Sequence, residues 1–392
     1  MGVTAMTYSA ERIEEDCYKL GKDYFGPFLY GFVKWLHREI VERSIDKAFF
    51  LSRDGYMMIK AYRHLFGNDN TRYIYFSRNS LRMGLLYKCR NYSESIEYLT
   101  KERYISLSKI LKYYGFGEKE QEEISKKYGI PLEAEYLLER LSGENIVKNI
   151  YDNYTCIIKK RSYAQARMLR KYLEQNNVSG KCAIIDIGWH GSMQYYLEQF
   201  AENEGIALNV LGLYVGIDPI YQTKSTMRGY AFSPTDFRNR KKVLCFLGGY
   251  ERLFQSQDGS TKGYKEEREE IVPILDSYEY EGRTELKKAI SLWQQGAMEY
   301  IHSDKKSEDE TKLIGPIMKF GMNPPQWGIE IFKDFFIKDG SDQVYVSTKP
   351  LYKYHIKELI HTLSNSVWKT GFMKSIMRIP FPYYWIYAGM RR

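Results

Sequence analysis

The sequence predicts an α/β fold with Rossmann-like parallel sheets, a large helical insertion and a helical carboxyl-terminal part. Two stretches carry this prediction. The apolar run at 47–51 ends in Ser-Arg-Asp-Gly before a helix-like segment, and the apolar run at 182–187 ends in a second polar, glycine-rich cluster. Apolar strands that lead into polar turns and helices are typical of parallel sheets, which bind ligands at the carboxyl ends of their strands.

The elements are predicted in order from their apolar periodicity. Helices at 8–22 and 26–43 precede a strand–helix–strand unit made of residues 47–51, 55–66 and 72–76. Residues 90–180 show helical periodicity without a strand signal, so we expect a helical insertion there. The rest of the chain predicts strands at 182–187, 208–216 and 228–232, helices at 191–204, 241–256 and 276–304, and a loop at 256–264.

A chain of 392 residues is long for one domain, so we expect several parts. The predicted division is a first Rossmann-like unit with amino-terminal helices at 1–90, a helical insertion at 91–180, a second Rossmann-like unit at 181–270, a helical region at 271–366 and a basic, aromatic tail at 367–392.

The composition limits which kinds of binding partner and which cellular compartment we expect. The net charge of +9 comes without dense Lys/Arg blocks, which favours anionic small molecules or phospholipids and argues against nucleic acid. The five cysteines include no CxxC pair, so neither a zinc site nor a disulfide framework is indicated. We see no secretory signal and no run of ~20 apolar residues that could span a membrane. We therefore expect a cytoplasmic protein.

The first candidate cluster follows the first strand: Ser52, Arg53, Asp54 and Gly55. Asp54 can accept a proton or bond a sugar hydroxyl, and Arg53 can pair with a phosphate. Gly55 permits close approach of backbone or ligand at the start of a helix, where free N–H groups attract anions. The alternative is that Asp54 simply caps this helix.

Two more segments can contribute to the same site. Ser77 and Arg78 follow the next strand, and Arg78 beside Arg53 would form a diphosphate clamp, unless Ser77 is an ordinary helix cap. Ser260 and Lys262 lie in a Gly-, Ser- and Thr-containing loop that can cradle a phosphate or serve as a plain surface turn. Glu251 lies within a predicted helix and is a candidate second carboxylate.

The third cluster surrounds the end of the strand at 182–187. Asp186 ends this strand, and His190 is a candidate general base near neutral pH. Trp189 offers a stacking surface for a base or sugar, unless it belongs to the core. The candidate binding residues here are Trp189, Gly191, Ser192 and Gln194.

Residues 367–392 contain five Lys or Arg residues and no acid, interleaved with aromatic residues and methionines. A basic, aromatic segment of this kind is typical of contact with an anionic membrane surface. Pro380 and Pro382 limit any helix to a short one. The alternative is that this tail docks on the protein's own core.

Three segments together resemble a known family: Phe50-Leu-Ser-Arg-Asp-Gly55, Tyr75-Phe-Ser-Arg78 and Ile185-Asp-Ile-Gly-Trp-His-Gly191. They are similar to the region that follows the haloacid-dehalogenase-like domain in predicted hydrolases of bacterial polysaccharide gene clusters. The resemblance covers residues 20–270 and implies a role in surface-polysaccharide synthesis.

One departure from the haloacid-dehalogenase pattern bears on the chemistry. In the overlay, Ser52 stands where phosphatases of that superfamily have their nucleophilic Asp, Ser77 takes the place of the second motif's Ser or Thr, and Asp186 that of the acidic metal site. A serine cannot form the acyl-phosphate of those enzymes, which weakens a phosphatase interpretation.

We therefore expect an enzyme: a membrane-peripheral transferase of bacterial surface-polysaccharide biosynthesis, attached to the inner face of the membrane. It would be a glycosyltransferase with a nucleotide-sugar donor and a lipid-linked or polysaccharide acceptor. Asp54 or His190 would deprotonate the acceptor hydroxyl, and Arg53 and Arg78 would neutralise the leaving diphosphate without a metal or cofactor. Two alternatives are a phosphohydrolase or phosphotransferase with Mg²⁺ at Asp54 and Asp186, and a non-catalytic subunit of an assembly complex.

Overall fold

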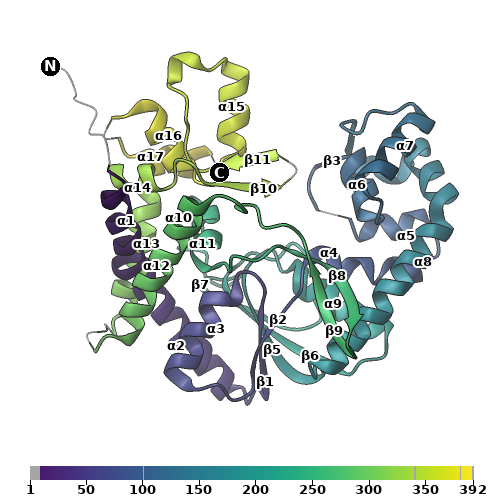
Figure 1. Cartoon of the computed structure of the whole chain (residues 1–392), viewed down its shortest axis with the longest axis horizontal. Coiled ribbons are helices and arrows are strands. Elements are labelled where there is room, and N and C mark those ends of the chain that lie inside the picture. Colours follow the sequence, from purple (N-terminus) through teal and green to yellow (C-terminus); the bar gives the residue numbers. More distant parts are fainter. Residues whose placement is uncertain are drawn as a thin grey trace.

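A five-stranded, fully parallel sheet organises the protein (Figure 1). The structure is a computed structural model that describes residues 9–99, 101–304, 306, 308–339, 341–379 and 381–390. The strand order is β2 (Thr71–Ile74), β1 (Lys47–Leu51), β5 (Gly180–Trp189), β6 (Leu208–Ile217) and β7 (Met227–Phe232). The predicted α/β class is confirmed. The two predicted Rossmann-like units, however, form one sheet, because β1 pairs directly with β5.

Alternate side chains of each strand enter different cores. Ala48 and Phe50 of β1 belong to one core, whereas Phe49 and Leu51 belong to the other. Because both faces are covered, most of β1 and the middle of β5 and of β6 are apolar on both faces, whereas the edge strands β2 and β7 include polar residues. The first core is formed with α2 (Gly26–Glu42), α3 (Gly55–Phe66), α11 (Leu247–Phe254) and α12 (Thr284–His302), and the second with α4 (Arg78–Met83), α8 (Asn145–Gln175) and α9 (Ser192–Asn203).

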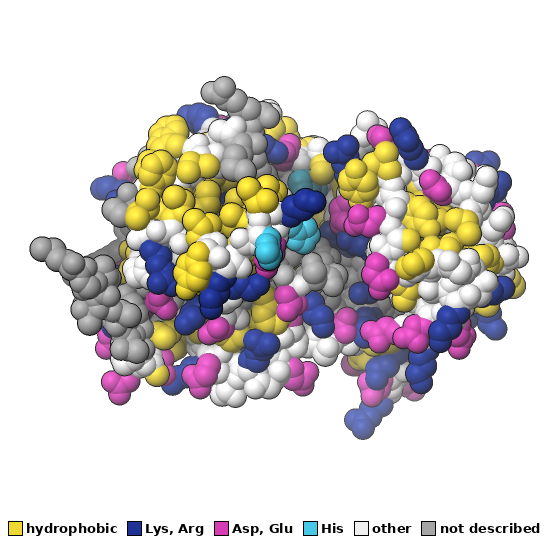
Figure 2. All heavy atoms as spheres, turned by 90° about the horizontal axis from the view of Figure 1, so that it is seen from above, with side chains coloured by type: hydrophobic (Ala, Val, Ile, Leu, Met, Phe, Trp, Pro, Cys, Tyr) yellow, Lys and Arg dark blue, Asp and Glu magenta, His cyan; other side chains and the backbone are white. Residues whose placement is uncertain are grey.

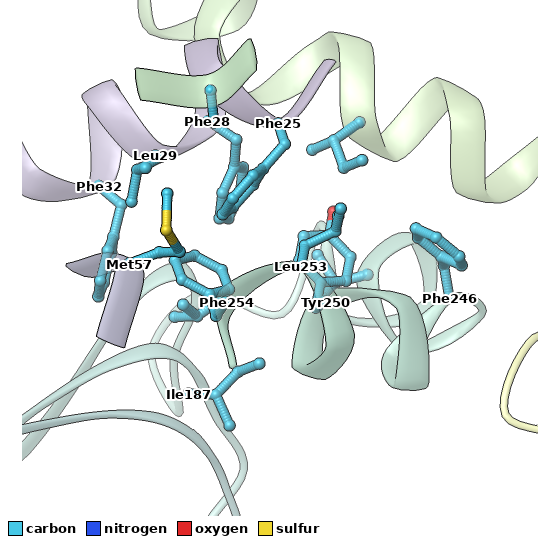
Figure 3. Close-up of a cluster of buried hydrophobic side chains, with 14 of the residues drawn as sticks. Phe25, Phe28, Leu29, Phe32, Met57, Ile187, Phe246, Tyr250, Leu253 and Phe254 are labelled. Carbon is cyan, nitrogen blue, oxygen red and sulfur yellow. The ribbon is translucent and has the colours of Figure 1, made fainter. Parts of the chain in front are cut away.

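An aromatic cluster joins α2 and Phe25, the residue just before it, to α11 (Figure 3). The rings of Phe25 and Phe254 meet edge to face at 4.8 Å, and those of Phe28 and Tyr250 at 5.3 Å. Edge-to-face ring pairs stabilise the folded state beyond the free energy that comes from burying the apolar surface of the rings. The cluster thereby holds α11, the helix that carries Glu251, in a fixed position near the sheet.

The predicted helical insertion has its own hydrophobic core. It also contains a two-stranded antiparallel sheet that the sequence analysis did not predict. Strands of three residues are too short to give a periodic signal. The insertion consists of α5 (Tyr92–Glu97), β3 (Tyr104–Ser106), α6 (Leu107–Tyr113), α7 (Glu118–Tyr128), β4 (Glu135–Leu137), the 3₁₀ turn η3 (Leu138–Gly143) and the long helix α8, with the 3₁₀ turn η2 (Leu86–Lys88) before it.

A hairpin of β8 (Thr261–Glu267) and β9 (Glu270–Leu275) begins within the segment predicted as a loop and packs along α8. Tyr264 stacks on Tyr172 at 4.5 Å. Gln175 accepts a hydrogen bond from the Ile271 N–H at 2.7 Å and donates one to the Ile271 carbonyl at 3.1 Å. The prediction of a loop at 256–264 is therefore wrong from Thr261 on, where the backbone finds a strand partner.

The remaining elements surround the first core. The predicted helix at 276–304 starts only at α12, because turns fill residues 276–283, with Gly282 at a φ of +78°. The predicted helical region at 271–366 also contains β9 and a second hairpin. The bounds are α1 (Ala10–Lys19), the π-helix η1 (Leu20–Phe25), α10 (Arg240–Leu244), α13 (Glu310–Met322), α14 (Gln326–Ile331), β10 (Phe336–Asp339) and β11 (Ser341–Val344).

The carboxyl-terminal segment folds onto the protein as the 3₁₀ turn η4 (Leu351–Lys353), α15 (Ile356–Asn365), α16 (Lys369–Met377) and α17 (Tyr383–Met390). Trp368 and Phe372 are fully buried, and Tyr383 and Tyr387 nearly so. For these four side chains the structure shows burial in the protein itself, so the described residues of 367–379 and 381–390 do not form a free tail. Among the described residues, no helix combines the length and the apolar character needed to cross a membrane.

Candidate functional site

The candidate site lies where β1 ends beside the carboxyl-terminal half of β5. After β1 the chain continues to β2 on one side, whereas β5 is followed by β6 on the other, so the crossover direction reverses between them. Ligands of open parallel sheets bind at such a switch point, outside the carboxyl ends of the strands. Phe50 is paired with Ile185, so Asp54 and Asp186 come just after paired positions at the same sheet edge.

Three carboxyl groups, Asp54, Asp186 and Glu251, form what we call the carboxylate cluster. Burial raises the pKa of all three, and the charge of Asp54 further raises the pKa of Asp186 and of Glu251. The pKa of Asp186 lies well above its ordinary value, and that of Glu251 rises to about 7. Like charges in a poorly solvated site cannot all ionise. The cluster therefore keeps a proton near neutral pH.

Asp54 occupies the cap position of α3 but does not cap it. Its side chain makes no capping hydrogen bond, and its Oδ1 atom is buried without a hydrogen-bond partner. The capping alternative for Asp54 is therefore not what the structure shows. Gly55 allows close packing of the backbone and not the approach of a ligand, because a Cβ at this position would lie 2.9 Å from the Phe50 carbonyl carbon.

Trp189 orients Glu251. Its indole Nε1 donates a hydrogen bond of 2.9 Å to Glu251 Oε1, while its ring is buried and stacks on Phe232 at 6.0 Å. The tight turn at the end of β5 places it there. Gly188 adopts a φ of +99°, and a Cβ at this position would lie 2.6 Å from the Gly216 carbonyl oxygen. Trp189 thus supports the cluster from the core side and offers no open stacking surface.

Three arginines lie within electrostatic reach of the cluster. Arg53, Arg252 and Arg78 each lower the pKa of Asp54, which opposes the effect of burial. Arg252 is buried and forms an ion pair of 2.7 Å with Glu279, and Arg53 is 3.4 Å from the same carboxylate. Glu279 therefore holds two of the positive charges in place at the edge of the site.

The sequence analysis missed Arg252 and Glu279. A signal for Arg252 existed, because a Glu-Arg pair inside the otherwise apolar helix Leu247–Phe254 needs partners when that helix is buried. Glu279 lies between two tyrosines in a turn region, where nothing in the pattern distinguishes a buried ion-pair partner from a surface acid.

Ser52 and Ser77 lie at the ends of β1 and β2. Ser52 Oγ is 3.4 Å from the Phe76 carbonyl oxygen. Ser77 caps α4 in a reciprocal arrangement with Ser80, and its hydroxyl donates a 2.5 Å hydrogen bond to the Thr261 carbonyl. The helix-cap interpretation of Ser77 thus holds, and its hydroxyl is already engaged.

Several other predicted residues are exposed or have contacts of their own. His190 is exposed, and its Nδ1 is 3.2 Å from the Asp218 carbonyl oxygen. Lys262 is on strand β8 and pairs with Asp276 at 3.0 Å. Gly191 has a φ of +76°, and the half-buried Ser192 begins α9. Gln194 is fully buried and forms hydrogen bonds with Tyr214 and Glu198. Ser260 is exposed.

A cavity of about 690 Å³ is lined by residues of α3, α12 and the segment that follows α11. Its lining includes Ser256, whose N–H donates to the Arg53 carbonyl at 3.1 Å, and Tyr56, two residues after Asp54. None of the three carboxylates lines it. Its walls carry mostly amides, hydroxyls and charged groups: Tyr56, Lys60, Ser256, Gln257, Asp258, Ser291, Gln294, Gln295, Met298, Glu299 and His302. Such a lining suits a hydroxyl-rich ligand.

Within the part of the chain that the structure describes, no group of three or more His, Cys, Asp or Glu side chains is arranged to hold a metal ion. The site nevertheless combines two kinds of group: carboxyl groups that can release and accept a proton, and positively charged arginine side chains near them. Comparison of the sequence with models of known protein families finds no match, and comparison with curated proteins finds none either.

Proposed function

We propose that the protein is a transferase of surface-polysaccharide synthesis that transfers a sugar from a nucleotide-sugar donor. The observation that supports this most is the carboxylate cluster at the switch point, with raised pKa values and an orphaned Asp54 oxygen. A carboxylate that retains basicity near neutral pH is suited to remove a proton from an acceptor hydroxyl. Asp54 is the proposed base, and Glu251 is the neighbour that shares its proton.

The arginines at the border are the proposed partners of the donor diphosphate. Arg53 and Arg78 flank the cluster, and preorganised positive charge stabilises a leaving diphosphate in the transition state. The neighbouring cavity is the proposed acceptor side, because its hydroxyl and amide lining matches the hydroxyl groups of a glycan. His190 stays an alternative base, although its exposed ring bonds Asp218.

We also propose that the enzyme works at the inner face of the bacterial membrane without spanning it. Residues 367–392 contain no acid, and Met377, Ile379, Phe381 and Trp385 are exposed, whereas the rings of Phe372, Tyr383 and Tyr387 are buried. A lipid-linked acceptor is held at the same membrane surface, so peripheral attachment would bring enzyme and acceptor together.

The test is nucleotide release from a panel of nucleotide sugars, with lipid-linked and free glycan acceptors supplied. We expect turnover on at least one donor, and a ~10²–10⁴-fold lower kcat for Asp54→Asn because the base is lost. Glu270→Gln, an exposed carboxylate on β9, is the control and should turn over like wild type. Folded protein that releases no nucleotide from any donor, or an Asp54→Asn variant at full rate, would refute the proposal.

One observation favours a second candidate, a phosphohydrolase or phosphotransferase. Strands β2, β1 and β5 are adjacent; Ser77 and Asp54 follow β2 and β1, and Asp186 lies in the carboxyl-terminal half of β5, an arrangement similar to the haloacid-dehalogenase overlay. The described residues provide no three-ligand metal group, and Ser52 replaces the nucleophile, so we derive no step through Mg²⁺. Metal-dependent phosphate release in the same assay, abolished in Asp54→Asn, would favour this candidate.

A further inference from the structure

Half of the large apolar side chains that are exposed in the described residues fall between residues 351 and 386. Isolated apolar side chains on a protein surface are ordinary, whereas a gathered set marks an interaction site. Figure 2 shows hydrophobic side chains gathered on the lobe that contains α15, α16 and α17 in Figure 1. We call the set the C-terminal apolar face: Leu351, Tyr352, Ile356, Ile360, Met377, Ile379, Phe381, Trp385 and Ile386.

Helix α15 contributes a limb of this face that the sequence analysis did not identify. Ile356 and Ile360 are one helical turn apart, so their side chains share a side of the helix. They are 76% and 62% exposed, and Tyr352 in the preceding turn is 84% exposed. Leu359 and Leu363 are only partly exposed. The apolar side of α15 therefore includes two side chains, Ile356 and Ile360, that are exposed to solvent instead of packed on the protein.

The other limb comes from the end of the chain. Trp385 on α17 is 71% exposed, and Ile379 and Phe381 before it are 47% and 44% exposed. Helix α16 packs against both α15 and α17 and so connects the two limbs. The buried rings of Trp368 and Phe372 anchor α16 in the core, which fixes the limbs relative to each other.

Charge decides which partner fits. Residues 343–392 contain eight Lys or Arg residues, six of them in the part that the structure describes, and a single acid, Glu358, which pairs with Lys349 at 2.7 Å. A second copy of the chain would bring two strongly positive surfaces together, which like-charge repulsion opposes. An anionic bilayer attracts basic residues and accepts exposed aromatic and aliphatic side chains at its interface.

We propose that the C-terminal apolar face docks on an anionic lipid bilayer through both limbs, with Tyr352, Ile356 and Ile360 of η4 and α15 inserted beside Ile379, Phe381 and Trp385. This inference rests on the proposed peripheral membrane location and adds the α15 limb to it. It is independent of the chemistry at the carboxylate cluster.

Flotation of the full chain with vesicles tests the proposal. Wild type should bind vesicles of phosphatidylserine and phosphatidylcholine, bind phosphatidylcholine vesicles at least 10-fold more weakly, and dissociate as salt screens the charges. The double variant Ile356→Ser/Ile360→Ser should partition at least 10-fold less into the anionic vesicles. The matched control Ile157→Ser/Tyr163→Ser removes two exposed apolar side chains from α8 and should float like wild type.

Three results would overturn the inference. They are wild-type flotation of the α15 double variant, absence of flotation by wild type itself, and a concentration-dependent dimer that this double variant loses, which would identify a second copy as the occupant. Nucleotide release with a soluble acceptor, measured on the same preparations, should not change in the α15 variant. If the transferase assay fails, the vesicle result can therefore still be interpreted. If flotation fails, the transferase result can still be interpreted.

Discussion

Replacing Glu251 with Gln should change how the stability of the protein depends on pH. The pKa of Glu251 rises from 4.5 to about 7 in the folded state, chiefly because it is buried and then because Asp54 is near. Between these two values the folded protein binds a proton that the unfolded chain has lost. By linkage, the stability that this group contributes is present at low pH and lost as the pH rises through that window.

The size of the effect follows from the same two values. They differ by 2.5, and each pKa unit corresponds to about 1.4 kcal/mol, so ionising Glu251 in the folded state costs ~3 kcal/mol. A Gln side chain is uncharged at every pH, and its Oε1 can still accept the hydrogen bond from Trp189. Relative to wild type, Glu251→Gln should therefore gain less than about 1 kcal/mol at pH 5 and about 3 kcal/mol at pH 8.

Urea denaturation, followed by tryptophan fluorescence at pH 5 and pH 8, measures this difference. The control is Glu285→Gln, which removes an exposed carboxyl group from α12 and should leave the pH dependence of wild type unchanged. If the difference between wild type and Glu251→Gln is the same at both pH values, Glu251 does not titrate with a raised pKa, and the reasoning about the cluster is wrong.

Two further predictions concern packing and the ion pairs. Arg252→Met should destabilise the protein by about 3–5 kcal/mol in urea titrations, because Glu279 would lose its buried partner; a loss below 1 kcal/mol would show that the pair matters little. Gly21→Ala should lower the melting temperature at a cost of about 1–3 kcal/mol, because a Cβ there would lie 1.9 Å from the Trp293 carbonyl oxygen. Gly143→Ala, whose Cβ would meet no atom within 4 Å, should melt with wild type, and equal melting of both variants would contradict this account.

Local patterns allowed the α/β class and the positions of β1, β2, β5 and β6 to be predicted, because a sheet covered on both faces needs continuous apolar strands. That β1 pairs with β5 could not be predicted, because 128 residues separate Leu51 from Gly180 and the pairing depends on tertiary packing. For the same reason the sequence suggested two units where the structure has one sheet.

The candidate site was predictable in part. Asp54 and Asp186 stand out because each follows a run of apolar residues, and the structure brings them within electrostatic reach of each other. The prediction that Asp186 ends its strand is wrong, because β5 continues to Trp189 and stays paired with β6 as far as Ile217. Glu251 joins them from a helix far along the chain. Neither the buried Arg252–Glu279 pair nor the role of Trp189 as the partner of Glu251 could be read from spacing, since both arise from contacts between distant segments. Whether these residues are catalytic stays a prediction.

The hairpin β8–β9 ties the insertion mechanically to the edge of the sheet. Helix α8 has 31 residues and so extends for about 46 Å, from the body of the insertion to the hairpin. At its sheet end, Tyr264 stacks on Tyr172, donates a hydrogen bond of 2.7 Å to the Tyr75 carbonyl and lies 3.2 Å from the Ser80 hydroxyl. Any swing of α8 as a rigid lever must therefore either carry the end of β2 and the start of α4 with it or break these contacts.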